Sequence, residues 1–275
     1  MTIIVRTAAK ATAFTRRGGR CRRFSAALLT CMAFGQAHAQ TAAGLFVSAT
    51  RLVFSSGARD ASLQIYNENP DPVVVQTWVD AGDIEADPAT IDVPFVVLPP
   101  IMRLQANEAR ALRIVYSQQP LPADRESVFW LNAQMIPPRP AGDAKPNVMD
   151  VSVRIRQKIF FRPRQLTGGS QAWMASLHCR VAGREDAGMR VRCENPSPYF
   201  ATLDSLTLQE LDGQYFAPGG MLEPFGSGVF RLDRRRVPVA SDPTPEPGRL
   251  HATVIDDDGR LEVLVMGSDN GARNR

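Results

Sequence analysis

Hydrophobic residues after residue 40 fall in short runs, and several of these runs alternate apolar with polar side chains. Alternation with a period of two is typical of a β-strand that buries one face. The runs are rich in β-branched and aromatic residues, and Gly, Pro, Asn and Asp separate them. No long amphipathic helix pattern follows residue 40, so the sequence predicts an all-β protein.

The runs fall into two sets, separated by a connector at residues 162–169. The first set predicts strands at 45–54, 61–66, 73–79, 94–104, 111–116, 128–136 and 148–161. The second predicts strands at 172–181, 189–193, 201–208, 229–232, 250–255 and 261–266, with a hairpin around Tyr215 and Met221. Short strands at this spacing are typical of an immunoglobulin-like sandwich. We therefore expect two immunoglobulin-like domains, at 40–163 and 164–275.

The clearest alternation lies at residues 147–155. Its apolar positions are Met149, Val151, Val153 and Ile155, and polar residues stand between them. The strand then reaches Lys158, an aromatic pair and Arg162-Pro163. This combination indicates a strand edge that another chain can pair with, a binding mode called β-augmentation.

The N-terminus has the composition of a secretory signal peptide. Residues 1–23 carry seven basic and no acidic side chains, residues 24–35 are mostly apolar, and Ala37-His38-Ala39 supplies a small-x-small cleavage site. We predict that residues 1–39 are removed on export to the periplasm. A lipoprotein site before Cys31 and a twin-arginine signal match the sequence less well.

Removal of this segment changes the electrostatics. The whole chain has a formal charge of +4, but without residues 1–39 there are 25 basic and 28 acidic residues. Nucleic-acid binding therefore loses its support. The remaining chain has 23 arginines but only two lysines, Lys145 and Lys158, which draws attention to the lysine that follows the alternating strand.

Two cysteines remain after position 39, and their surroundings predict a disulfide. Cys179 and Cys193 lie in two strand-like runs around a polar turn, and a hairpin folded about Asp186 places them opposite each other. An even pair in an exported protein favours a bridge over a reactive thiol.

The residues for enzyme chemistry are sparse. The remaining histidines are His178 and His251, and no nucleophile motif accompanies them. Asp256-Asp257-Asp258 lacks the spacing of a calcium loop, and the chain has neither a glycine-rich phosphate loop nor a Cys-x-x-Cys motif. We expect no catalytic site, metal or cofactor.

Several segments resemble the periplasmic chaperones of the chaperone–usher pathway, the PapD-like family that assembles pili. The most specific are Asp124-Arg125-Glu126-Ser127 and the Lys-x-Phe-Phe-Arg-Pro segment at 158–163. The resemblance extends to residues 50–54, 99–104, 121–132, 136–138, 194–200 and 255–259, and so covers nearly all of the chain after the signal.

The resemblance implies two immunoglobulin-like domains in an L-shaped arrangement, with a pilus subunit bound in the cleft and later passed to an outer-membrane usher. It assigns the cations that anchor the subunit's terminal carboxylate to Arg51 and Lys158. It assigns the donor strand to residues 147–155 and an interdomain ion network to Glu126, Arg162 and Asp257. Packing within the first domain is the competing explanation for the donor residues, and Asp256 or Asp258 could replace Asp257.

Three functional hypotheses remain at this point, and the third of them is an exported hydrolase that acts through His178 or His251. The first is a periplasmic chaperone without catalytic activity, which binds subunits and the usher but neither nucleic acid nor the membrane interior. The second is an exported adhesion or structural module that needs no incomplete partner. An unpaired strand edge also leaves self-association of the free protein open.

Overall fold

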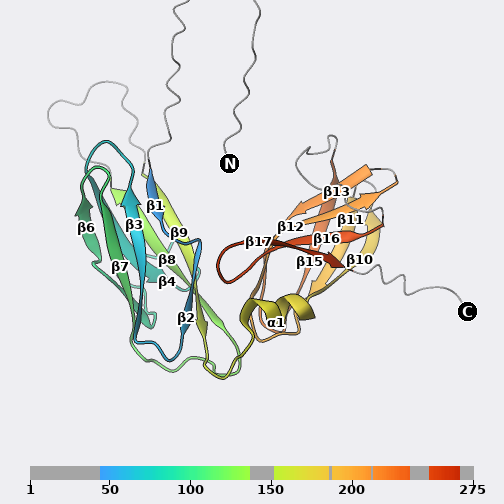
Figure 1. Cartoon of the computed structure of the whole chain (residues 1–275), viewed down its shortest axis with the longest axis horizontal. Coiled ribbons are helices and arrows are strands. Elements are labelled where there is room, and N and C mark those ends of the chain that lie inside the picture. The colour runs from blue at the N-terminus through green and yellow to red at the C-terminus, as the bar shows by residue number, and fades with distance from the viewer. Residues whose placement is uncertain (1–43, 137–151, 186–187, 212, 236–247, 267–275) are drawn as a thin grey trace, which may run out of the picture. The chain divides into compact units, whose positions relative to one another are not determined.

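The computed structural model describes residues 44–136, 152–185, 188–211, 213–235 and 248–266. These residues form two β-sandwich domains, as the sequence predicted (Figure 1). The proposed signal peptide and the first two donor positions, Met149 and Val151, lie outside the described residues.

The first domain packs two sheets around one apolar core. One sheet has the order β1-β3-β7-β5, and the other, which we call the β9 sheet, has the order β2-β9-β8-β4-β6. The strands are β1 Leu45–Val47, β2 Arg51–Ser55, β3 Asp60–Asn67, β4 Val73–Asp80, β5 Phe95–Leu98, β6 Ile101–Leu104, β7 Ala109–Tyr116, β8 Ser127–Ile136 and β9 Arg154–Arg162. Phe54, Phe95, Phe129 and Phe161 fill the centre of the core with ring contacts from both sheets.

Two of the strands expected in this domain are broken. The run 45–54 divides because β1 pairs with β3 in one sheet, whereas β2 runs parallel to β9 in the other. The run 94–104 divides at Pro99 and Pro100, which have no backbone N–H to donate to a neighbouring strand. Because of these breaks, each of the two runs contributes one strand to each sheet.

The second domain forms one hydrogen-bonded path of strands in the order β10-β11-β15-β13-β12-β16-β17, with β14 beside β12. The elements are α1 Gly169–Ser176, β10 His178–Glu185, β11 Gly188–Glu194, β12 Ala201–Glu210, β13 Gly213–Pro218, β14 Met221–Leu222, β15 Ser227–Arg234, β16 Leu250–Ile255 and β17 Leu261–Met266. Its two end strands, β10 and β17, contact each other, so the path folds back around a core of its own.

The expected strand at 172–181 is partly wrong, because residues up to Ser176 form α1. Trp173 and Leu177 are buried one helical turn apart, and Met174 is buried beside them, so a short helix places these side chains in the core. The expected hairpin around Tyr215 and Met221 is also wrong, since β13 and β14 each pair with β12 instead of each other.

The predicted disulfide between Cys179 and Cys193 is confirmed. The two residues are directly opposite each other in the β10–β11 pair, with their Cα atoms 4.0 Å apart, and both are buried in the second core. Closing a loop of this length stabilises a domain by about 3 kcal/mol in the chain-entropy model.

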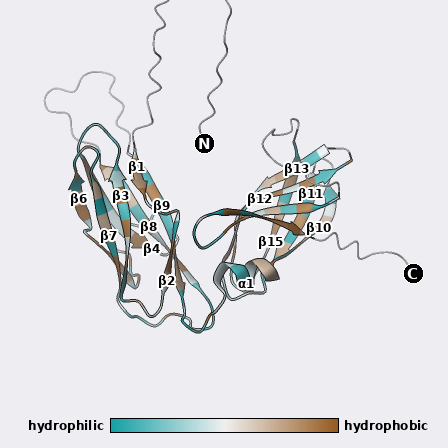
Figure 2. Cartoon of the chain, viewed as in Figure 1, coloured by the Kyte–Doolittle hydropathy of each residue, from teal (hydrophilic) through white to brown (hydrophobic). Residues whose placement is uncertain are grey.

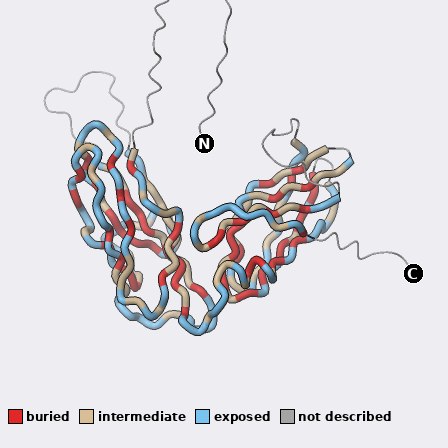
Figure 3. The backbone as a smooth tube through the Cα atoms, viewed as in Figure 1, coloured by how far each residue is buried: buried red, intermediate tan, exposed pale blue. Residues whose placement is uncertain are grey.

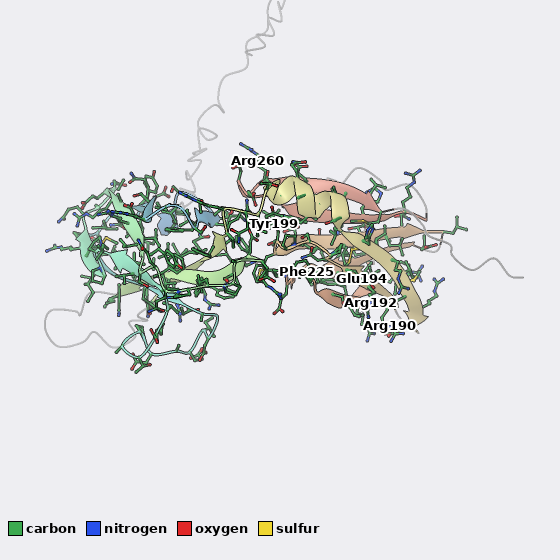
Figure 4. All side chains as sticks on the ribbon, turned by 90° about the horizontal axis from the view of Figure 1, so that it is seen from below. Arg190, Arg192, Glu194, Tyr199, Phe225 and Arg260 are labelled. Carbon is green, nitrogen blue, oxygen red and sulfur yellow. A yellow bond between two sulfur atoms is a disulfide. The ribbon has the colours of Figure 1, made fainter. Side chains whose placement is uncertain are left out.

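Burial alternates along the strands as the sequence pattern predicts (Figures 2 and 3). On β11, Val191 and Cys193 are buried, whereas Arg190, Arg192 and Glu194 extend from the other face and are labelled in Figure 4. The charged face of this strand therefore stays in solvent while its apolar face packs on the core.

Candidate functional site

The two cations that the resemblance singled out are brought together by the sheet. β2 and β9 are parallel, and Arg51 is the direct Cα partner of Lys158. Directly paired residues in a sheet extend from the same face. Arg51 is only 8% exposed, its Nη1 donates to the carbonyl oxygen of Ile255 at 3.0 Å, and its Cζ lies 5.9 Å from the Phe160 ring centroid.

Both cations are partly desolvated. Burial lowers the pKa of Lys158, and the charge of Arg51 lowers it further. Burial also lowers the pKa of Arg51, although Asp256 and Asp257 oppose that change. Within the described ranges, the Lys158 ammonium has no hydrogen bond or ion pair, and Arg51 Nε is buried without a partner. An incoming carboxylate would relieve the repulsion between these two cations and supply the missing acceptor.

The first residues of β9 have an unpaired edge. On one side β9 pairs with β8 from Arg154 to Phe161, but on the other side β2 begins only at the level of Lys158. Among the described strands, none pairs with the second edge of β9 from Arg154 to Gln157. This edge presents backbone donors and acceptors to a further strand.

The described donor positions behave differently from each other. Val153 is 38% exposed, and its carbonyl oxygen accepts from the N–H of Met135 at 2.8 Å. Ile155 is partly buried and packs against the core of its own domain, which is the competing explanation for this position. The exposed side chain of Val153 is therefore the available apolar group next to the open edge.

The expected ion network is assembled around Arg162, at the end of β9. Arg162 Nε donates to Glu126 Oε1 at 2.6 Å, and Nη1 and Nη2 donate to the two Asp257 oxygens at 2.7 and 2.9 Å. Glu126 also accepts from the Phe200 N–H at 2.9 Å, and Asp257 accepts from the Ser170 N–H at 3.1 Å. These contacts join residues of both domains.

Tyr199, which is labelled in Figure 4, packs against the Arg162 guanidinium. The Arg162 guanidinium lies 5.1 Å from the centroid of its ring, and the Tyr199 hydroxyl donates to the carbonyl oxygen of Thr167 at 2.6 Å. The network is therefore flanked by a side chain of the second domain, which is held in turn by the backbone of the connector.

Burial and charge act in opposite directions on the network. Burial lowers the pKa of Arg162, but the hydrogen bonds and charges of Asp257 and Glu126 outweigh burial, and its pKa is raised. Burial raises the pKa of Asp257, but the hydrogen bonds and charge of Arg162 outweigh it, and the pKa of Asp257 is lowered. For Glu126, burial prevails over the attraction of Arg162, and its pKa is raised.

The lowered pKa of Asp257 predicts an acid-sensitive domain contact. The ionised form stabilises the fold above the ordinary carboxyl pKa of about 3.9, and this contribution is lost as the pH falls through the lower folded-state value. We expect Asp257→Asn to lower the free energy of unfolding at pH 7 and to reduce its fall between about pH 5 and pH 2. Urea unfolding over a series of pH values measures both. Asp258→Asn is the matched control, because its exposed carboxylate pairs with Arg260 in the same turn and with no other residue that the structure describes. Equal pH profiles for the two variants would contradict this assignment.

The remaining candidate residues are dispersed. His178 is exposed on β10, and His251 lies on β16. In the part of the chain that is described, no group of three His, Cys, Asp or Glu residues is arranged to hold a metal ion. Asp256, Asp257 and Asp258 instead accept from different partners, Arg260 N–H, Arg162 and the Arg260 guanidinium respectively. The same described residues include no helix long and apolar enough to cross a membrane.

Sequence reasoning missed a buried polar cluster on the outer face of the β9 sheet. Its centre is Asp80, at the end of β4, which is 1% exposed and contacts Arg154, Arg156 and Asn132. The only signal in the sequence is a charged residue directly after the apolar run 73–79, and that position is also common at the start of a loop.

Family models match both domains. Residues 44–167 match the N-terminal domain of the PapD pili and flagellar-assembly chaperones, and residues 172–264 match the PapD pili assembly chaperone C-terminal domain. The chain belongs to the PapD family of pilus assembly chaperones. This is a family of chaperones and not of enzymes.

Individual relatives of the PapD-family chain cover most of it. The probable fimbrial chaperone YadV of Escherichia coli K12 is 32% identical over 208 residues, which are 74% of this chain and 83% of that protein. The chaperone protein FimB/FhaD of Bordetella pertussis is 32% identical over 215 residues, 77% of this chain and 86% of that one.

Solved structures of chaperones are similar to this PapD-family protein as well. The Pseudomonas aeruginosa CupB2 chaperone has a TM-score of 0.65 and 30% identity, over 81% of this chain and all of that one. The Salmonella enterica SafB chaperone, solved in complex with the SafA pilin, gives a TM-score of 0.62 and 25% identity, over 82% and 95%.

Proposed function

We propose that this PapD-family chaperone captures pilus subunits by lending them the strand at 147–155 and by anchoring their terminal carboxylate on Arg51 and Lys158. The observation that carries the proposal is the open edge of β9 at Arg154–Gln157, which ends at the level of the paired cations. SafB, a relative of similar fold, was solved with a pilin bound.

A pilus subunit that lacks one strand has an apolar groove and an unpaired backbone edge, both of which promote aggregation. A strand beside β9 would pair that edge, while alternating apolar side chains fill the groove. Each fully buried Val, Ile or Met contributes about 1.5–3 kcal/mol. Hydrogen bonds to the charged carboxylate contribute roughly 1.5–3 kcal/mol each.

The ion network has a separate role in the proposal. Glu126, Arg162 and Asp257 hold the two domains in contact, and Arg162 belongs to the same strand as Lys158. We place the boundary between the two domains between residues 163 and 164, shortly after the end of this strand.

The same proposal covers export and handover. Residues 1–39 act as a cleaved signal peptide, the protein works in the periplasm without catalytic activity, and the loaded chaperone delivers its subunit to an outer-membrane usher. When no subunit is bound, the open edge of β9 can pair with a second copy of the chain.

The donor strand is tested by Val153→Thr, which keeps the branched shape and the strand propensity of the side chain. A hydroxyl without a partner in an apolar groove costs about 1–3 kcal/mol, so we expect roughly tenfold weaker binding of a co-expressed pilin subunit. Titration of the purified subunit complex measures the loss.

Val229→Thr is the matched control, because Val229 is 59% exposed on β15 of the second domain and does not belong to the proposed donor strand. The donor-strand proposal is wrong if Val153→Thr and Val229→Thr bind the subunit equally well.

A further inference from the structure

One face of β9 carries three cations in a row. Arg154, Arg156 and Lys158 occupy alternate positions of a strand whose register with β8 is continuous, so their side chains leave the same face. Successive members are about 6.7 Å apart along the strand. Only Lys158 has a role in the proposed carboxylate site.

Such a row creates an ambiguity in how a subunit can pair with β9. A slip of one residue turns every apolar side chain to the wrong face, so the alternating pattern prevents it. A slip of two residues keeps all apolar side chains on the correct face. The alternation therefore cannot exclude a subunit whose carboxylate binds Arg156 instead of Lys158.

Asp80 contacts both of the other cations, Arg154 and Arg156. Its Oδ1 accepts a hydrogen bond from Arg156, and its Oδ2 lies 3.5 Å from Arg154 Nη2. Asn132 Nδ2 donates to Oδ2 at 2.7 Å, and the Gly82 N–H donates to Oδ1 at 2.7 Å. Although burial opposes ionisation, the hydrogen bonds from Arg156, Asn132 and Gly82 lower the pKa of Asp80.

Aromatic rings and neutral acceptors complete the arrangement. Arg154 lies over the Trp78 ring at 4.6 Å and donates to Asn132 Oδ1 at 2.9 Å and to the Ile84 carbonyl oxygen at 2.6 Å. Arg156 lies over the Trp130 ring at 4.8 Å.

Each guanidinium group therefore has hydrogen-bond acceptors within its own domain, although Arg154 Nη2 and Arg156 Nε are buried without a hydrogen-bond partner among the described residues. By contrast, Lys158 has no acidic partner in the described part of the chain.

We propose that Asp80 determines the binding register: by holding Arg154 and Arg156, it leaves Lys158 and Arg51 as the cations that receive the subunit carboxylate. This inference rests on the proposed function, because it concerns where the same carboxylate binds. Asp80 is a positioning residue and does not touch the subunit. The competing explanation is that Asp80 only stabilises the sheet.

The two explanations predict different subunit affinities for a double variant. Lys158→Ala alone removes an anchor, and we expect little pilin capture. In Asp80→Asn/Lys158→Ala, Arg156 is released and can bind the carboxylate. We expect this double variant to bind the subunit roughly tenfold or more tightly than Lys158→Ala, the gain from one charge-assisted hydrogen bond. A purely structural role for Asp80 makes the double variant bind no better than Lys158→Ala.

Register itself is measured by cross-linking. A pilin subunit is co-expressed in the periplasm with the full-length chaperone and purified as their complex. Val153→Cys in the chaperone is combined with single cysteines along the groove of the subunit. With Asp80 present we expect one preferred cross-link, and with Asp80→Asn we expect a second one shifted by two residues. An unchanged pattern in Asp80→Asn contradicts the proposal.

Further variants guard against loss of folding and against misassignment. Asp80→Asn/Arg154→Gln removes one charge of each sign and still releases Arg156, so it carries the test if the single variant does not fold. Arg156→Gln should bind the subunit as the unsubstituted chain does, and a loss comparable to that of Lys158→Ala would show that Arg156 already serves as an anchor. Asp60→Asn, which breaks an exposed pair with Arg113 on the other sheet, is the matched control.

The outcomes also separate the inference from the proposed function. If Lys158→Ala binds the subunit normally, the carboxylate site itself is wrong. If Lys158→Ala abolishes binding but Asp80→Asn neither shifts the cross-link nor restores binding, the site stands and the register role of Asp80 is wrong.

Discussion

Replacing Lys158 with alanine is expected to reduce pilin capture to less than about a tenth of its normal level. The subunit carboxylate would remain desolvated beside Arg51 with one cation fewer, and truncating one partner of a buried, hydrogen-bonded charge pair costs about 2–5 kcal/mol. Co-purification of a pilin subunit with the periplasmically expressed chaperone measures the loss. The variant should fold normally, because the Lys158 ammonium has no described partner within the chain and repels Arg51.

The matched control for this experiment is Arg164→Ala. Arg164 is an exposed cation six residues further along the chain, and its side chain donates only to the backbone of Gly57 among the described contacts. Normal capture by both variants would contradict the assignment of Lys158, whereas equal loss by both would point to general electrostatic attraction.

Replacing Arg162 with methionine is expected to lower the free energy of unfolding by about 3–5 kcal/mol. Methionine has a similar length but leaves the Glu126 carboxylate, whose side chain is 2% exposed, without its cation. Removing one partner of a buried ion pair leaves an uncompensated charge, and the cost of that charge dominates the effect. Urea denaturation of the purified protein measures the change.

A second substitution tests the cause of this destabilisation. In Arg162→Met/Glu126→Gln the buried carboxylate is also removed, and we expect part of the stability to return. The amide oxygen introduced at position 126 would still accept from the Phe200 N–H in place of the carboxylate. A double variant that is as unstable as Arg162→Met would mean that Arg162 acts through packing on Tyr199 and not through charge.

The architecture was predictable because strand alternation is a local signal. Polar and apolar positions on β7 and β11 identify their buried faces without knowledge of their neighbours. The errors arose where a distant partner decides the conformation. Residues 45–54 form one apolar run, but β3 and β9 lie in different sheets and pair with its two halves separately. The chain around Trp173 is helical because the second core needs Trp173, within α1, and Leu177, directly after it, on one side.

The candidate site was predictable in part for a related reason. Lys158 follows a long alternating strand and is one of two lysines after position 39, so it could be noticed from composition. The direct pairing of Lys158 with Arg51, more than a hundred residues away, depends on the parallel register of β2 and β9 and could be expected only from the family resemblance. The sequence did not indicate the polar cluster around Asp80, because its partners, Arg156 and Asn132, come from two other strands.

β9 also has a mechanical consequence. The same continuous strand contains Arg154, the cation Lys158 and the domain-bridging Arg162, and β8 holds it along nearly its whole length. β9 cannot shift along β8 to fit a bound subunit without breaking the backbone hydrogen bonds between the two strands. Any difference in length must then be accommodated within the subunit. All pilus subunits that this protein binds should therefore share one spacing between their final residue and their open groove.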